Sequence, residues 1–199
     1  MTENVAVEIP TVETERLLLR AWSAADREPF AAMNADPEVM RYMSGRLDRA
    51  GSDALVDRII EDWATNGFGL WAIERRSDGR FIGFAGLWRP RFEAPFMPAV
   101  EVGWRLSRDA WGLGYATEGG RASVRHGFEE VGLDEIVSFT AVGNVRSRRV
   151  MERLGMTRDP ADDFDHPRIE PGRPIRRHVL YRLRREDWAA ARDGKPGGA

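Results

Sequence analysis

VEVGWRLSRDAWGLGYATEGGRASVRHGF, residues 100–128, is the stretch that decides the fold of this chain. Its first residues alternate between apolar and other side chains, which is the period of a β-strand. Gly112 and Gly114 follow where the backbone must turn tightly, and a helix is expected from about Tyr115. A glycine loop that leads into a helix gathers free backbone N–H groups at the positive end of the helix dipole. We therefore expect a phosphate or a pyrophosphate on this loop.

Two common phosphate-binding loops match this stretch poorly. A Walker loop has Lys and then Ser or Thr after its last glycine, whereas Tyr115 and Ala116 follow Gly114. A dinucleotide-binding loop has Gly or Ala at the position of Thr117. Taken alone, the segment leaves an ordinary turn between a strand and a helix open as the alternative.

The predicted helix carries small residues on one face, at spacings of three and four. They are Ala116, Gly120, Ser123 and Gly127. A glycine inside a helix costs about 1 kcal/mol relative to alanine. We therefore expect this face to pack closely on the sheet, or on a ligand at the N-terminus of the helix.

Residues 111–118, WGLGYATE, resemble the acyl-CoA pyrophosphate loop of the GCN5-related N-acetyltransferase (GNAT) superfamily, in the branch of the ribosomal-protein N-terminal (Rim-type) acetyltransferases. Three further regions resemble that branch in the same order: TERLLLR at 14–20, WAIE with FIGFAGL at 71–87, and NVRS through LGM at 144–156. The resemblance covers nearly the whole chain. It implies a single-domain α/β fold with a mixed central sheet of about six to seven strands, splayed middle strands and flanking helices.

The same resemblance divides the chain into three parts. Residues 1–13 form an N-terminal extension, residues 14–185 an acetyltransferase domain, and residues 186–199 a short helix with a flexible tail. Ser23 and Asp26 have the spacing of a capping box at a helix start. Strands are expected at 16–21, 70–75, 80–87, from 100, at 135–141 and at 175–183, and helices at 23–33, from 36, at 52–66, from 115 and from 144.

Composition limits the function classes. The chain has 199 residues, a formal net charge of −2, three histidines and no cysteine. The charge gives no basic field for nucleic acid, and the lack of cysteine removes disulfides and thiol chemistry. No apolar run approaches the ~20 residues of a membrane span, and no secretory signal is visible. We predict no metal, no nucleic acid or membrane partner, and a cytoplasmic protein, with His126 on a helix surface and His178 in a strand.

The resemblance implies acetyl-CoA as the co-substrate. Its pyrophosphate would lie on the N–H groups of residues 112–117, and its pantetheine arm would pair with the strand near Trp104, Arg105 and Leu106 like an added strand. Asn144 would bond the pantetheine, or is only the N-cap of a helix. The complete set expected to bind the co-substrate is Trp104, Leu106, Trp111, Gly112, Leu113, Gly114, Tyr115, Ala116, Thr117, Asn144 and Ser147.

Two residues are candidates for the chemistry. Glu101 lies on the strand expected to carry the co-substrate, and an acid at this position in the family often accepts the proton of the amine. The alternative for Glu101 is a solvated carboxylate, or one that is ion-paired with Arg105 on the same face. Ser147 would bond the sulfur or the pantetheine, or is only a small polar residue on a packed helix. Many family members have a tyrosine acid where this chain has Met151, so the proton donor to the thiolate stays open between Ser147, the nearest donor one turn earlier, and solvent.

The walls of the acceptor site are expected from two irregular loops, at residues 89–98 and 160–174. Trp88, with Phe92 and Phe96, lines the acceptor pocket in one interpretation and belongs to the core in the other. The second loop contains aspartates that would favour a cationic acceptor if they flank the pocket, and a solvated loop is the alternative. These aspartates are Asp162, Asp163 and Asp165.

We predict an N-acetyltransferase that moves an acetyl group from acetyl-CoA to a primary amine by direct attack in a ternary complex. No cysteine is present to form an acyl-enzyme. The acceptor stays open between a protein N-terminus and a small-molecule amine. The alternatives are a catalytically silent acyl-CoA-binding module, which Met151 favours, and an antibiotic-modifying acetyltransferase of the aminoglycoside type. Edge strands would permit a homodimer.

Overall fold

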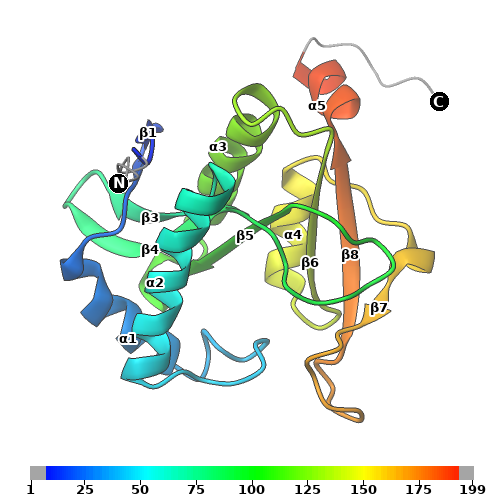
Figure 1. Ribbon diagram of the computed structural model, residues 1–199, viewed down its shortest axis with the longest axis horizontal. Helices are drawn as coiled ribbons and strands as arrows, with labels where there is room; N and C mark the ends of the chain where they lie inside the picture. Colours follow the sequence, from blue (N-terminus) through cyan, green and yellow to red (C-terminus); the bar gives the residue numbers. More distant parts are fainter. Residues whose placement is uncertain (1–7, 193–199) are drawn as a thin grey trace, which may run out of the picture.

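A computed structural model describes residues 8–192; the others, which include the tail expected to be flexible and part of the expected extension, lie outside the described residues. The fold is built on an eight-stranded mixed sheet with the strand order β1-β2-β3-β4-β5-β6-β8-β7 (Figure 1). The strands are β1 (Val12–Glu13), β2 (Leu17–Arg20), β3 (Leu70–Arg75), β4 (Arg80–Trp88), β5 (Glu101–Leu106), β6 (Glu135–Ala141), β7 (Phe164–Asp165) and β8 (Arg177–Arg184). The α-helices are α1 (Arg27–Ala35), α2 (Arg49–Asn66), α3 (Tyr115–Glu129), α4 (Val145–Arg153) and α5 (Arg185–Arg192). The predicted α/β class is confirmed, and the strand count exceeds the expected six to seven because β1 and β7 add two short strands.

Helices cover both faces of the sheet (Figure 1). On one face, α3 packs so closely that a Cβ on Gly119 would lie 3.2 Å from Cβ of Ala85 in β4. On the other face, the ring of Phe30 in α1 lies 6.0 Å from that of Phe84. Ala85 and Phe84 are adjacent in β4, and adjacent strand residues point to opposite faces. The predicted close packing of α3 is confirmed at Gly127 as well, where a Cβ would lie 2.8 Å from a β6 side chain.

The sheet opens in its middle. β5 pairs antiparallel with β4 along its whole length, but in the described part of the chain it pairs with β6 only through Glu101 and Val137, in parallel. Beyond that pair the two strands run apart, which divides the sheet into one half with β1 to β5 and another with β6 to β8 (Figure 1). The splayed middle strands that the resemblance implied are therefore present.

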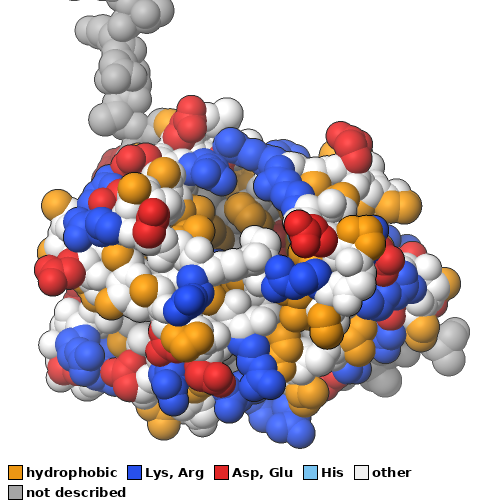
Figure 2. Space-filling view, turned by 90° about the horizontal axis from the view of Figure 1, so that it is seen from below, with side chains coloured by type: hydrophobic (Ala, Val, Ile, Leu, Met, Phe, Trp, Pro, Cys, Tyr) orange, Lys and Arg blue, Asp and Glu red, His pale blue; other side chains and the backbone are white. Residues whose placement is uncertain are grey.

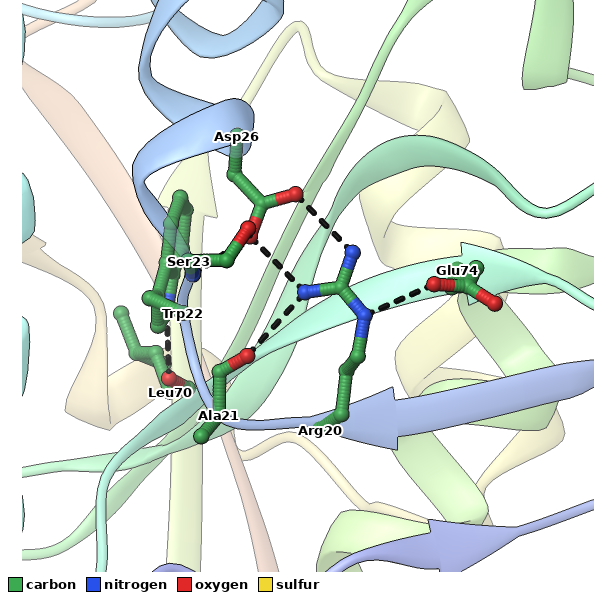
Figure 3. A network of polar contacts seen from close by, with 7 residues as sticks. All are labelled: Arg20, Ala21, Trp22, Ser23, Asp26, Leu70 and Glu74. Atoms are coloured by element: carbon green, nitrogen blue, oxygen red, sulfur yellow. Dashed lines mark hydrogen bonds and ion pairs between the residues drawn. The ribbon is translucent and has the colours of Figure 1, made fainter.

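A polar network fixes the connection from β2 to α1 (Figure 3). The guanidinium of Arg20 donates to both carboxylate oxygens of Asp26, at 2.8 and 2.9 Å, and to Glu74 of β3 at 2.8 Å. The backbone N–H of Ser23 donates to the Asp26 carboxylate at 2.7 Å, so the predicted capping box is present. These bonds fix the start of α1 on the N-terminal half of the sheet.

Two helix starts differ from the expectation. The helix expected from Asp36 does not form: the Asp36 carboxylate accepts from the N–H two residues later, at 2.8 Å, as a helix-capping aspartate does, but residues 37–44 form only turns and bends. The helix α2 begins earlier than expected, at Arg49, because the carboxylate of Asp48 caps it. The segment between α1 and α2 is therefore irregular, and it lies beside the open part of the sheet.

Candidate active site

The glycine loop between β5 and α3 presents backbone N–H groups to open space. Gly112 and Gly114 have φ values of 76° and 86°, which glycine adopts without the steric cost of a side chain. Gly114 is the N-cap of α3, and no side chain caps the helix there. A Cβ on Gly112 would meet no atom of the described residues within 4 Å. The loop therefore has free donors and room at a helix N-terminus, which suits a phosphate or pyrophosphate.

An ion pair that the sequence analysis missed holds this loop to the start of β2. Arg16 Nη1 donates to the carbonyl of Leu113 at 2.8 Å, and the guanidinium lies 4.8 Å from the centre of the Tyr115 ring. Glu118 pairs with Arg16 at 2.6 Å and accepts from the Thr14 hydroxyl at 2.6 Å. Burial alone would raise the pKa of Glu118, but the hydrogen bonds from Thr14 and Arg16 lower it below its usual value. Both charged residues stand in the quoted motifs, but nothing in their spacing pairs them.

The edge of β5 that faces β6 is paired at its start and open farther along. The carbonyl of Val100 accepts from the N–H of Val137 at 2.9 Å, and that of Val102 accepts from the Ser138 hydroxyl at 2.9 Å. Alternate residues of a strand direct their backbone groups to the same edge. Those of Trp104 therefore point into the gap, from which β6 has moved away. An extended chain with amide groups can pair there as an added strand.

Trp111 occupies the next position along that edge. Its Nε1–H donates to the carbonyl of Leu106 at 2.8 Å, so this carbonyl already has a partner within the protein. The guanidinium of Arg146 in α4 lies 4.6 Å from the centre of the Trp111 ring. Trp111 thus connects β5, the glycine loop and α4, while Leu113 at the tip of the loop stays 49% exposed.

The helix α4 begins on the other side of the gap. Asn144 caps it, with Oδ1 accepting from the N–H of Ser147 at 3.4 Å and Nδ2 donating to the Thr140 hydroxyl at 2.9 Å. Asn144 is therefore the N-cap of α4, and both Asn144 and Ser147 are half-buried. Tyr42, from the segment after α1, reaches this turn, because a Cβ on Gly143 would lie 3.5 Å from Cε1 of Tyr42. Figure 2 views the molecule from this end and shows a hollow with hydrophobic side chains in its floor and basic side chains around it.

Glu101 lies at the closed end of the gap, where β5 and β6 still pair. The residue is 7% exposed, and its carboxylate accepts a hydrogen bond from Nε1 of Trp88. Burial raises the pKa of Glu101 to about 8, although the bond from Trp88 opposes the shift. The two alternatives for Glu101 are wrong, since the side chain is buried and Arg105 bonds Oδ1 of Asn34 instead, at 2.6 Å. A carboxyl that titrates near neutral pH is suited to take a proton from an amine.

The irregular loops contribute less to this site than expected. Phe92 and Phe96 pack on Phe139 and Phe164 in a small second core of the C-terminal half, whereas Trp88 donates a hydrogen bond to Glu101. The aspartates of the second loop are ion-paired with arginines: Asp162 with Arg182 at 2.8 Å, Asp163 with Arg158, and Asp165 with Arg176 at 3.3 Å. These pairs neutralise the negative charge that was expected to favour a cationic acceptor.

The expectation for His126 is wrong, while that for His178 is confirmed. His126 is half-buried, and its ring centre lies 5.0 Å from that of Trp71 and 6.3 Å from that of Trp63. Burial lowers the pKa of His126. His178 lies in β8, as expected. Met151 is 1% exposed and has no proton to donate to a leaving group.

Residues 8–192 hold neither a cluster for a metal ion nor a candidate membrane helix. No group of three or more His, Asp or Glu side chains is arranged there to hold a metal ion. No helix in the same range is long and apolar enough to cross a membrane.

Comparison with known proteins gives consistent matches. The pattern of the acetyltransferase (GNAT) domain matches residues 16–157. The chain is 35% identical over 190 residues to the FsC-acetyl coenzyme A-N(2)-transacetylase of Aspergillus fumigatus, which covers 90% of this chain and 78% of that protein. It is 29% identical to YdaF of Bacillus subtilis, whose name proposes a ribosomal N-acetyltransferase, over 71% of this chain and 78% of that protein. A crystal structure of the acetyltransferase from Agrobacterium tumefaciens strain C58 matches with a TM-score of 0.72 and 30% identity, over 91% of this chain and 98% of that one. These matches confirm the resemblance seen in the sequence motifs.

Proposed function

Because this chain belongs to the acetyltransferase (GNAT) family, we propose that it moves an acetyl group from acetyl-CoA to a primary amine by direct attack in a ternary complex. Its class, an acyl-CoA-dependent acetyltransferase, follows from the family. The observation that carries the finer proposal is that β5 has an open edge directly before an uncapped glycine loop. The open edge suits the amides of pantetheine, and the loop suits the pyrophosphate.

The residues around the gap suit acetyl-CoA. The N–H groups of residues 112–117 would bind the pyrophosphate, and the backbone of Trp104 would pair with a pantetheine amide. Asn144 and Ser147, at the start of α4, would contact the pantetheine arm with their polar side chains from the other side of the gap. Leu106 would contribute less than the sequence suggests, because Trp111 already bonds its carbonyl. We propose that residues 14–185 form the acetyltransferase domain that contains these acetyl-CoA-binding residues.

The proposed chemistry needs one base and one good leaving group. Acetyl-CoA, when bound, supplies an acyl group activated as a thioester. The acceptor nitrogen would attack its carbonyl carbon, so that the C–N bond forms, the C–S bond breaks, and the proton of the amine passes to Glu101. With a pKa of about 8, Glu101 has a substantial ionised fraction at mildly alkaline pH. The thiolate would take its proton from solvent, because a thiol of pKa ~8.5 leaves readily.

One observation opposes turnover, and two support it. The buried Met151 leaves no acid at its position, which favours a silent acyl-CoA-binding module. Against this stand the buried carboxyl of Glu101 beside the gap and the enzyme names of the matched relatives. We therefore propose a transferase, and a silent acyl-CoA-binding module is the alternative.

The test follows thiol release from acetyl-CoA with a panel of small amines and N-terminal peptides, and measures CoA binding by calorimetry. We expect acceptor-dependent release that Glu101→Gln slows by about 100-fold or more. Gly112→Trp should weaken CoA binding by about 100-fold, because the indole would fill the space over the loop. Gly172→Trp is the matched control, since Gly172 has a similar φ of 84° and a Cβ there would also meet nothing within 4 Å.

Each other outcome has a clear meaning. CoA binding without release for any amine would favour the silent module. Equal loss of CoA binding in the Gly112 and Gly172 variants would mean that the effect comes from backbone strain and not from the loop site. No CoA binding by the wild-type protein would overturn the proposal.

A further inference from the structure

One face of β5 carries three residues in order along the strand: the proposed base Glu101, the glycine Gly103 and the cation Arg105. Glu101, Gly103 and Arg105 alternate with the residues whose side chains enter the core, so their side chains share a face. Arg105 touches Asn34 of α1 and the sulfur of Met43, at 2.6 and 3.4 Å. This is therefore the face covered by α1 and by the irregular segment after it. The face lies opposite to α3, whose N-terminus we assign to the pyrophosphate.

Among residues 8–192, no carboxylate forms an ion pair with Arg105. Its neighbours are the amide oxygen of Asn34, the sulfur of Met43 and the ring of Phe84, which lies 5.3 Å from the guanidinium carbon. Its Nε is buried and has no hydrogen-bond partner in the described part of the chain. Burial lowers the pKa of Arg105 to about 10, which leaves it a cation at neutral pH.

Two other half-buried arginines are paired with carboxylates, whereas Arg148, within the described residues, bonds only the Tyr181 hydroxyl and the Val142 carbonyl. Arg20 bonds two carboxylates, Asp26 and Glu74 (Figure 3), and Arg182 also bonds two. A buried cation is costly unless an anion pairs with it. The fold nevertheless fixes the guanidinium firmly, because Asn34 is itself held by a hydrogen bond from its Nδ2 to the Ser52 hydroxyl, at 2.9 Å, with both residues fully buried. A cation held in place without an anion is the arrangement expected of a ligand contact.

Space for at least a methyl group lies between the two charged residues. A Cβ on Gly103 would meet nothing closer than Oε1 of Glu101, at 4.0 Å. Gly103 therefore forms an open floor between a carboxyl and a guanidinium. Four residues of a strand separate their Cα atoms by ~13 Å, and Oε1 of Glu101 extends toward the centre of that span.

We propose that Arg105 binds a carboxylate on the amine acceptor, while the amine of the same molecule lies at Glu101. The acceptor class is therefore an amine that carries a carboxylate several atoms away, such as an amino acid or a peptide with an acidic side chain near its N-terminus. This inference rests on the proposed transferase function. Its alternative is that Arg105 only ties α1 to the sheet.

The test uses pairs of acceptors that have the same amine and differ only in a carboxylate or a carboxamide. Suitable pairs are 4-aminobutanoate with 4-aminobutanamide, and the C-terminal amides of Gly-Glu and Gly-Gln. We expect the wild-type kcat/KM for the carboxylate to exceed that for the carboxamide by about 10- to 100-fold, as for a charge-assisted hydrogen bond. Arg105→Gln should reduce this ratio to about one, and Arg105→Lys should retain part of it.

The ratio distinguishes recognition from folding, because a damaged fold would lower both rates together. Arg91→Gln is the matched control, since Arg91 pairs with Asp62 at 2.6 Å outside the β5 face, and it should leave the ratio unchanged. Turnover with equal rates on both members of every pair would overturn the inference and leave the transferase function intact. An Arg105→Gln variant that keeps the wild-type ratio would also overturn it. No thiol release with any acceptor would instead contradict the proposed function itself.

Discussion

The two edges of strand β5 differ. On the side of β4, the strand pairs along its whole length, from Glu101 with Trp88 to Leu106 with Gly83. On the side of β6, within the described residues, it forms a single pair, Glu101 with Val137. The first edge is closed by close contact of two backbones. The second offers the backbone groups of Trp104 to a ligand. The same strand thus stabilises the sheet with one edge and supplies a candidate binding site with the other. Substitutions at the two edges should therefore separate stability from activity.

A glycine, Gly83, makes the contact at the closed edge. Gly83 has a φ of 139°, and a Cβ there would lie 2.1 Å from the carbonyl oxygen of Arg105. Gly103 in β5 is the opposite case, because a Cβ there would meet only the Glu101 side chain, at 4.0 Å. A glycine can therefore lie either at a tight backbone contact or beside open space, and the structure is needed to distinguish the two cases.

Gly83→Ala should have the largest effect on the fold. A methyl group cannot occupy a position 2.1 Å from a backbone oxygen, so β4 and β5 would have to separate. We expect a loss of about 3 kcal/mol or more in the free energy of unfolding, measured by denaturant titration. Gly79→Ala is the control, because Gly79 also has a positive φ, 67°, but a Cβ there meets nothing within 4 Å. It should cost only ~1 kcal/mol. A Gly83→Ala variant as stable as Gly79→Ala would contradict the closed-edge account.

Glu101→Gln should stabilise the protein at alkaline pH. Glu101 titrates at about 8 in the folded state, above its ordinary value of 4.5, so the folded state binds the proton more tightly than the unfolded state. Stability from this group is therefore lost as the pH rises from about 4.5 to 8, and the cost is complete above that. The variant should exceed the wild type by on the order of 2–5 kcal/mol near pH 9 and match it near pH 5.

Thermal and denaturant unfolding of both proteins at the two pH values would measure this difference. The control is Glu61→Gln on the exposed surface of α2, which should not change the pH dependence. A variant that is no more stable than the wild type near pH 9 would show that ionised Glu101 is not penalised at the closed end of the gap. The activity assigned to Glu101 as a base would then need a different explanation.

The sequence predicted those parts of the molecule that depend on local patterns. The alternation in β5, the glycine loop and the small face of α3 follow from spacing, and each is present. The helix expected from Asp36 is wrong because an aspartate before a turn and an aspartate at a helix start have the same local signal. Pairs such as Arg16 with Glu118, and Arg105 with Asn34, are separated by 102 and 71 residues. No pattern in one sequence connects residues so far apart, so the contacts that hold the loop and the cation were not predicted.

Gly103→Ala should have the smallest effect on stability and a selective effect on activity. A Cβ at this position fits without a clash, so the free energy of unfolding should change by no more than ~0.5 kcal/mol. The methyl group would nevertheless stand on the floor between Glu101 and Arg105, where we infer that the acceptor lies. One methyl group in a binding pocket is worth ~1 kcal/mol or more, so the KM for the acceptor should rise by about fivefold to tenfold. CoA affinity, measured by calorimetry, should stay unchanged, because the open edge and the glycine loop are untouched.

Gly45→Ala, at an equally open position in the segment after α1, should change neither quantity. If Gly103→Ala weakens CoA binding and leaves the acceptor KM unchanged, then the two sides of β5 have been assigned to the wrong substrates.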